Sequence, residues 1–166
     1  MKTDKNKELG GVGGRAISPP DFSMPSGFAS GMRIDHIGIA VPNLEEAIKT
    51  YTALLGKAPD HLEEVKEQKA KTAFFSIDDS NLELLQSTSP DGPIGKFIEK
   101  QNGRGGLHHI CIQVDNIEQA LAEYKRAGIQ LIDEKPRIGA HGKLIAFVHP
   151  KSTGGILLEL SQTKGH

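Results

Sequence analysis

The 166-residue sequence contains one cysteine and no tryptophan, and only 5% of its residues are aromatic. The single cysteine, Cys111, excludes an internal disulfide framework, and its place in an alternating apolar run predicts a small buried side chain. The 20 basic and 21 acidic residues leave a formal charge of −1. The sequence has no basic stripe with interleaved aromatic residues, so nucleic acid is not an expected partner.

Long apolar runs are missing as well. No segment approaches the roughly 20 apolar residues of a membrane span, and residues 1–31 hold no apolar run that could form the core of a signal peptide. Those residues are charged at first and then rich in Gly, Ser and Pro, with Asp4, Glu8 and Asp21 making them less cationic than a typical transit peptide. We therefore expect a disordered leader or tag over residues 1–31. We also expect a cytoplasmic location, or the mitochondrial matrix if the source is eukaryotic.

The strongest positive feature is an internal repeat. Residues 36–48, HIGIAVPNLEEAI, return 73 positions later as residues 109–121, HICIQVDNIEQAL. Each copy begins with a histidine and reads as strand, turn and helix. With 37% hydrophobic residues the chain can bury one core. We therefore expect a single domain over residues 32–164, made of one module at about 33–88 and a second at about 106–162.

The local patterns place the elements within each module. Period-2 alternation predicts strands at 34–41, 71–77 and 81–86 in the first module, with a further short strand near 60–66. Asn43, followed three residues later by Glu46, predicts the start of a helix that Gly56 ends. The second module repeats this order, with a strand at 107–114, a helix at 116–127, and strands near 143–148 and 155–161. A short helix within residues 89–100 is expected between the modules.

Two histidines and two glutamates follow the repeat. His36 and His109 lie on the first strand of each module, and Glu83 and Glu159 lie on the last. Each of the four interrupts an apolar face, and the small residues Gly38 and Ala40 are in phase with His36. If the two sheets curve toward each other, the four side chains converge on a site for a divalent metal of the Zn, Co, Ni, Mn or Fe kind.

Other polar residues near these positions are not expected to bind metal. His108 should point to the face opposite His109, because neighbouring residues of a strand alternate between faces. The remaining histidines have no counterpart in the repeat, and no ligand role is predicted for them: His61, His141, His149 and His166.

The paired His-Ile-x-Ile-x-Val strands and the glutamate-bearing last strands resemble the vicinal oxygen chelate (glyoxalase-like) superfamily. The segments at 89–98, 106–110, 139–143 and 149–160 are similar to the methylmalonyl-CoA epimerase family within it. The resemblance covers residues 34–162. It implies an α+β fold, in which two tandem βαβββ modules form a curved eight-stranded mixed sheet with a metal site in the cup.

The resemblance also implies an activity, namely the interconversion of the 2R and 2S forms of methylmalonyl-CoA by removal and return of the C2 proton. A divalent metal of the Co, Zn, Ni or Mn class, held by His36, Glu83, His109 and Glu159, would stabilise the enolate oxygen as a Lewis acid. Glu159 and Glu67 match the two proposed acid/base groups. Glu63 and Glu64 lie close enough to Glu67 for a shift in alignment to reassign that second role.

The acyl-CoA substrate requires cations and backbone donors for its phosphates. Lys143, Lys151 and Ser152, the last at the start of a Ser-Thr-Gly-Gly turn, are the residues expected to supply them. An open cup leaves sheet edges and apolar surface exposed, so a homodimer is expected as well.

Three other functions share this architecture. A lactoylglutathione lyase of the glyoxalase I kind would use the same four ligands. An extradiol dioxygenase would use two histidines and one glutamate, with a further cavity histidine for which His141 is the obvious choice. A non-enzymatic drug-binding protein would need an aromatic cavity, whereas this chain has no tryptophan and only two tyrosines.

Overall fold

The structure, a computed structural model, describes residues 32–163. The expected leader over residues 1–31 lies outside the described residues. The described part contains strands β1 (Arg33–Ala40), β2 (His61–Val65), β3 (Ala70–Ile77), β4 (Ser80–Ser87), β5 (Gly106–Gln113), β6 (Arg137–Ile138), β7 (Leu144–Val148) and β8 (Leu157–Gln162). Its α-helices are α1 (Leu44–Leu55), α2 (Pro93–Lys100) and α3 (Ile117–Arg126), and its 3₁₀ turns are η1 (Lys66–Gln68), η2 (Ala140–Gly142) and η3 (Pro150–Ser152).

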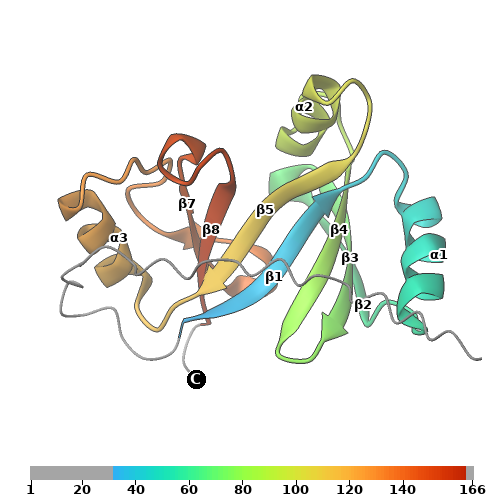
Figure 1. Cartoon of the computed structure of the whole chain (residues 1–166), viewed down its shortest axis with the longest axis horizontal. Helices are drawn as coiled ribbons and strands as arrows, with labels where there is room; N and C mark the ends of the chain where they lie inside the picture. Colours follow the sequence, from blue (N-terminus) through green and yellow to red (C-terminus); the bar gives the residue numbers. More distant parts are fainter. Residues whose placement is uncertain (1–31, 164–166) are drawn as a thin grey trace, which may run out of the picture.

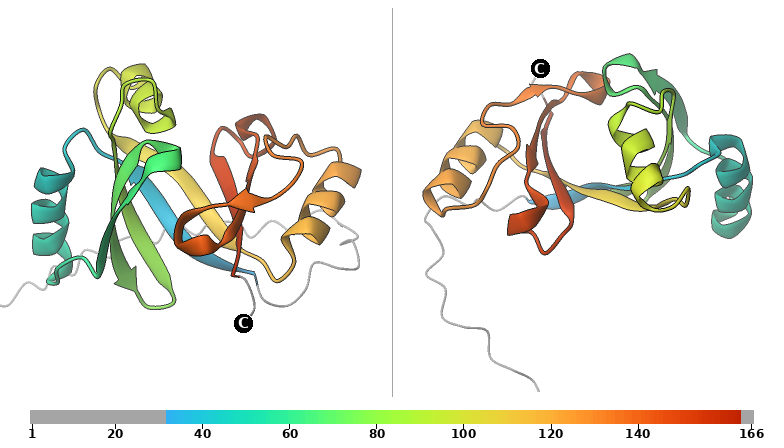
Figure 2. Two further views of the ribbon diagram at one scale, coloured as in Figure 1. Left: turned by 180° about the vertical axis from the view of Figure 1, so that it is seen from behind. Right: turned by 90° about the horizontal axis from the view of Figure 1, so that it is seen from above.

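The eight strands form one curved mixed sheet in the order β2-β3-β4-β1-β5-β8-β7-β6 (Figure 1). The two modules meet where β1 pairs antiparallel with β5 at the centre, and each of these strands pairs in parallel with the last strand of its own module, β4 or β8. Seen from above, the sheet curls into a half-barrel (Figure 2). The predicted architecture is confirmed, and β6, only two residues long, is the strand that the sequence pattern did not indicate.

The two long helices begin where the sequence predicts. The Asn43 side chain accepts a hydrogen bond from the Glu46 amide, and the Asn116 side chain accepts one from the Gln119 amide. These bonds satisfy amides that the first turn of a helix leaves without a partner. Gly56 ends α1 in the left-handed conformation (φ 68°), which glycine adopts at little cost. Among residues 32–163, none of the helices combines the length and apolar character that crossing a membrane requires.

The helices α1 and α3 cover the outer faces of the two modules and so define the inner face of the cup. Leu84 of β4 packs in the cluster that α1 covers, and Leu160 of β8 packs in the cluster that α3 covers. Because side chains alternate along a strand, the preceding residues, Glu83 and Glu159, face the other way. The same alternation that buries each leucine therefore directs a carboxylate into the cup.

The central strand pair contains two β-bulges. Between β1 and β5, Ile34 pairs with Ile112 and His36 pairs with Cys111, so Asp35 is the extra residue on β1. Further along, Gly38 pairs with His109 while Ile39 pairs with Leu107, so His108 is the extra residue on β5. These two positions are also 73 residues apart and related by the repeat.

A bulge interrupts the alternation of side chains between the two faces of a strand. For this reason the expectation that His108 points away from His109 is wrong. Both side chains line the same cavity, and their Nδ1 atoms lie 3.0 Å apart.

Candidate metal centre

The four residues expected to bind metal lie on four adjacent strands of the sheet. His36 on β1 and His109 on β5 occupy the central pair, while Glu83 on β4 and Glu159 on β8 flank them. Glu83 is aligned with Gly38 across the parallel β1–β4 pair, and Gly38 is aligned with His109 across the antiparallel pair. The strand register therefore brings two imidazoles and two carboxylates to one place at the bottom of the cup.

Their donor atoms lie close to one another. The Nε2 atoms of His36 and His109 are 2.9 Å apart. Oε2 of Glu83 lies 3.3 Å from Nε2 of His36 and 3.4 Å from Nε2 of His109. Oε2 of Glu159 lies 3.9 Å and 3.3 Å from the same two nitrogens. His36, His109 and Glu159 each offer a ligand atom within 4.8 Å of the others.

These separations fit a single divalent metal. Nitrogen and oxygen ligands bind such ions at about 2.0–2.2 Å, so neighbouring ligands around one ion are roughly 2.9–3.6 Å apart. Two imidazoles with two carboxylates suit a transition metal, whereas Ca²⁺ and Mg²⁺ take oxygen ligands. The chemistry of the donor set and its spacing therefore agree with the divalent metal that the resemblance implies.

Burial sets the protonation of the two carboxylates. Glu83 is 5% exposed and Glu159 is 7% exposed. Burial disfavours the charged form of each and raises the pKa of both to about 7, against the opposing effect of the His36 charge. Without a metal, a cluster of acids at this depth holds protons that a cation would replace.

The two histidines differ in protonation. Burial alone would lower the pKa of His36, but the hydrogen bond to Asp35 and the charge of Glu83 outweigh it and raise the pKa to about 11. Burial and the neighbouring positive charge of His36 hold the pKa of His109 well below its ordinary value. One imidazolium and one neutral imidazole therefore share a proton between their Nε2 atoms.

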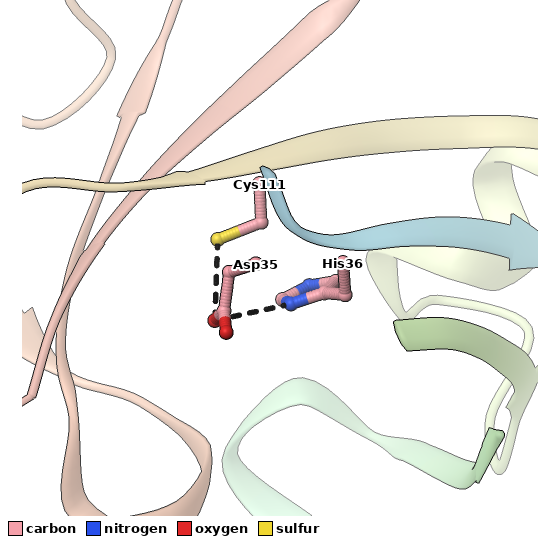
Figure 3. Close-up of side chains that lie close together, drawn as sticks. All are labelled: Asp35, His36 and Cys111. Atoms are coloured by element: carbon pink, nitrogen blue, oxygen red, sulfur yellow. Dashed lines mark hydrogen bonds and ion pairs between the residues drawn. The ribbon is translucent and has the colours of Figure 1, made fainter. Parts of the chain in front are cut away.

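Asp35 supports His36 from behind (Figure 3). Its Oδ2 lies 3.5 Å from Nδ1 of His36 and 3.9 Å from the Cys111 thiol, as the dashed lines show. The same carboxylate accepts hydrogen bonds from the Lys143 ammonium at 2.7 and 2.9 Å and from the Ser161 hydroxyl at 3.2 Å. A carboxylate on the far nitrogen of a ligating histidine fixes the ring orientation and leaves Nε2 free for a metal.

His109 is positioned by two close neighbours. Gly38 lies directly beneath its ring, where a Cβ atom would be 2.2 Å from Cε1 of His109. On the other side, His108 meets the Nδ1 atom of His109, and burial lowers the pKa of His108 to about 4, so that it stays neutral. The small residue Gly38 therefore leaves room for the ring of His109 and not for that of His36, with which it is in phase on β1.

The centre lies in a cavity of about 250 Å³. Its lining includes the four proposed ligands, the apolar side chains Phe74, Leu85, Ile94, Ile145, Phe147 and Leu157, and the polar side chains Gln68, His108, Arg137, His141 and Lys143. A largely apolar cavity with a few convergent polar groups is typical of a small-molecule site.

The residues expected to contact CoA are not together. Lys143 lines the cavity, but its ammonium is paired with Asp35. Lys151 and Ser152 belong to η3 and are not among the residues that line this cavity. The Ser152 hydroxyl instead accepts a hydrogen bond from the Gln130 amide.

Glu67 is not brought to the centre either. Glu67 is exposed on the 3₁₀ turn η1, and the residue that follows it, Gln68, lines the cavity. The turn ends at Lys69, which has the left-handed conformation (φ 51°). Glu63, on the neighbouring strand β2, is half-buried, and its charge acts on Glu83. Of the acidic residues in this segment, Glu63 therefore lies electrostatically nearest to the centre.

Asp35 was not among the predicted site residues, although the sequence carried a signal for it. A polar residue precedes the leading histidine in both copies of the repeat, Asp35 in the first and His108 in the second. In each copy this residue occupies the bulge and supports the following histidine.

Residues 35–147 match the Glyoxalase/Bleomycin resistance protein/Dioxygenase superfamily. The human mitochondrial methylmalonyl-CoA epimerase is 42% identical over 130 residues, 78% of this chain and 73% of that protein. An ethylmalonyl-CoA/methylmalonyl-CoA epimerase of Cereibacter sphaeroides is 38% identical over 131 residues, 78% of this chain and 97% of that protein. The chain belongs to the methylmalonyl-CoA epimerase family of this superfamily.

A solved structure supports this family assignment. It is a single-substitution variant of the Streptomyces coelicolor methylmalonyl-CoA epimerase in complex with 2-nitronate-propionyl-CoA, with a TM-score of 0.74 and 35% identity over 80% of this chain and 95% of that one. The family relationship favours an epimerase over the lactoylglutathione lyase and the drug-binding protein that share the architecture.

Proposed function

We propose that this protein interconverts the 2R and 2S forms of methylmalonyl-CoA. The observation that carries the proposal is the convergence of His36, Glu83, His109 and Glu159 at the bottom of the cavity, in a chain that belongs to the epimerase family. The substrate class follows from relatives named as methylmalonyl-CoA or ethylmalonyl-CoA epimerases.

The reaction removes the proton on C2, between the thioester and the carboxylate, and returns it from the opposite side. His36, Glu83, His109 and Glu159 are the proposed ligands of a divalent cation of the Co, Zn, Ni or Mn class. When bound, this cation supplies Lewis-acid stabilisation to the oxygen on which negative charge develops. The apolar walls of the cavity limit the access of water and strengthen these interactions.

Glu159 is the proposed acid/base group on one side of C2. Its carboxylate lies in the cavity beside the other proposed ligands, where a carboxylate can take a proton from the substrate and return it. The group on the other side is proposed to come from the segment that holds Glu63 and Glu67. Glu63 is the better placed of the two, because it is half-buried beside the cup whereas Glu67 is exposed.

The CoA portion would extend from the cavity toward solvent. Lys143, Lys151 and Ser152 remain the proposed contacts for its phosphates. Lys143 would serve as a fixed positive charge at the cavity wall, because Asp35 already holds its ammonium in place. Lys151 is exposed and free to reach a phosphate without displacing a buried partner.

Assembly and location complete the proposal. We propose a homodimer. Ile34 and Leu107, at repeat-related positions of the two central strands, are 47% and 45% exposed. The outer surface of these strands between α1 and α3 carries no helix among the described residues and could pair with a second copy (Figure 1). Light scattering of the purified protein measures this directly. A single domain over residues 32–164 would act in the cytoplasm, or in the mitochondrial matrix if the source is eukaryotic; the human relative is named as a mitochondrial protein.

The decisive experiment follows deuterium at C2 of methylmalonyl-CoA in heavy water. It compares metal-reconstituted protein, protein stripped by a chelator, Glu159→Gln, and Glu118→Gln as a matched exposed control. We expect metal-dependent exchange in the wild type and in Glu118→Gln, and its loss in the stripped protein and in Glu159→Gln. Absence of exchange from every metal-reconstituted form would exclude the proposed reaction.

A further inference from the structure

A second group of side chains able to bind a metal consists of residues other than the four proposed ligands. His61 and Glu63 are on the same face of β2, two residues apart, and His141 is in η2 of the other module. Oε2 of Glu63 lies 3.2 Å from Nε2 of His61 and 3.7 Å from Nδ1 of His141. The ligand atoms of all three residues lie within 4.8 Å of one another. We refer to these three residues as the mouth triad.

The mouth triad joins the two ends of the sheet. β2 and β6 are the outermost strands in the sheet order, and η2 directly follows β6. The sheet curls so far that these ends approach each other, as the view from above shows (Figure 2). The imidazole rings of His61 and His141, from opposite modules, are consequently only 5.0 Å apart.

The ring of Phe74 lies close both to the mouth triad and to the buried centre. Its centroid lies 6.2 Å from that of His61 and 5.4 Å from that of His141. The centroid of the same ring lies 6.4 Å from that of His36 in the buried centre. The two groups of donors have no residue in common, and Phe74 lies next to both, while His141 also lines the cavity of the buried centre.

The donor atoms of the mouth triad have capacity for a cation. Oε1 of Glu63 is buried and has no hydrogen-bond partner among the described residues. Oε2 is the atom that faces the two imidazoles, and a cation bound to both oxygens of the carboxylate would also give Oε1 a partner, which a buried oxygen otherwise lacks at a cost in free energy. The side chains of His61 and His141 are 50% and 44% exposed, so an ion can reach them from solvent.

We propose that the mouth triad binds a second divalent transition metal, such as Zn²⁺, with His61, Glu63 and His141 as ligands and water in the remaining positions. Two imidazoles and one carboxylate select such ions over Ca²⁺ and Mg²⁺. Binding here is weaker than at the buried centre, because there are three protein ligands instead of four and two of them are exposed. The bound ion links β2 to η2 and so holds the two edges of the half-barrel together. While the ion is bound, Glu63 cannot serve as the acid/base group proposed above.

The test measures how many metal ions the protein binds. Protein stripped by a chelator is equilibrated by dialysis against increasing Zn²⁺, and bound zinc is determined by mass spectrometry for wild type, His61→Ala, His141→Ala and His149→Asn. His149 is a matched control, since its side chain accepts a hydrogen bond from the Lys151 amide and asparagine can keep this bond. We expect a tight first equivalent in all four proteins and a weaker second equivalent only in the wild type and in His149→Asn.

Hydrogen exchange then tests whether the second ion links β2 to η2. In the wild type, adding the second equivalent of Zn²⁺ should slow amide exchange in residues 61–65 and 137–143 more than the first equivalent does. The same addition should not slow exchange in these residues of His141→Ala. The first equivalent, retained in each variant, shows that the variant is folded. A single equivalent in the wild type, or a second equivalent bound equally by His61→Ala and His141→Ala, would overturn the proposal.

Discussion

Asp35 and His36 are consecutive residues of one strand, yet their side chains lie side by side, with Oδ2 of Asp35 3.5 Å from Nδ1 of His36. The β-bulge at Asp35 makes this possible, because a regular strand would direct the two side chains to opposite faces. The carboxylate is itself held by Lys143 and Ser161, so it acts as a rigid support for the imidazole.

Replacing this support should weaken metal binding. Asp35→Asn keeps the shape of the side chain but loses the charge that orients His36 and pairs with Lys143. We expect the affinity for Zn²⁺ or Co²⁺ to fall by about 10–100-fold. Competition with a chromophoric chelator measures this affinity, and Asp79→Asn, in the exposed turn before β4, should leave it unchanged. Equal affinity in Asp35→Asn and wild type would show that the buried carboxylate does not support the ligand.

Gly38 should tolerate no side chain. An alanine Cβ at this position would lie 2.2 Å from Cε1 and 2.8 Å from Nε2 of His109, so the imidazole must move away from the other three donors. We expect Gly38→Ala to lose at least ~1 kcal/mol of unfolding free energy by overpacking and to bind metal more weakly. Gly106→Ala is the control, because a Cβ there meets no heavy atom within 4 Å. Thermal unfolding with and without metal separates the two effects, and identical behaviour of both variants would contradict the role given to Gly38.

Much of the fold follows from local patterns. The alternation in the strands and the asparagine caps at Asn43 and Asn116 are properties of short segments, and the structure retains them. The inward direction of Glu83 and Glu159 is likewise a consequence of the leucines that flank them. The repeat predicted that the four side chains converge, because equivalent positions of two similar modules come together where the modules pair.

Features that depend on distant pairing could not be predicted in the same way. The bulges at Asp35 and His108 arise from the register between β1 and β5, two strands that are far apart in the chain. The approach of His61 to His141 depends on the accumulated curl of eight strands. The outward direction of Glu67 results from a single 3₁₀ turn whose geometry no periodic pattern indicates.

The two acidic residues near the cup should differ in their effect on catalysis. Glu63 is half-buried and has one buried oxygen without a partner among the described residues, whereas Glu67 is exposed. If Glu63 is the second acid/base group, Glu63→Gln should lower the rate of epimerisation by about 10²–10⁴-fold, with Glu67→Gln close to wild type. Steady-state rates with (2R)- and (2S)-methylmalonyl-CoA measure this. The reverse order would return the role to Glu67 and require η1 to turn inward when substrate binds.

Metal binding should release protons at neutral pH. In the metal-free protein the pKa of His36 is raised to about 11 and those of Glu83 and Glu159 to about 7, so at pH 7 the imidazole and part of the carboxylates carry protons. A group whose pKa is raised by folding stabilises the folded state while the group is protonated. For His36 this contribution to stability is complete below pH 6.5 and is lost only as the pH rises through about 11.

A metal requires the same nitrogen and oxygen atoms without their protons, so affinity should increase with pH, most steeply up to about 7, where the carboxylates still titrate. Titration calorimetry with Zn²⁺ in buffers of different ionisation enthalpy measures the protons released, and we expect about one or more at pH 7. Glu83→Gln removes one titrating carboxylate and should flatten the dependence on pH just below 7. Binding without proton release at pH 7 would show that His36 is neutral before the metal arrives, and that the carboxylates around it do not hold the proton that the cation replaces.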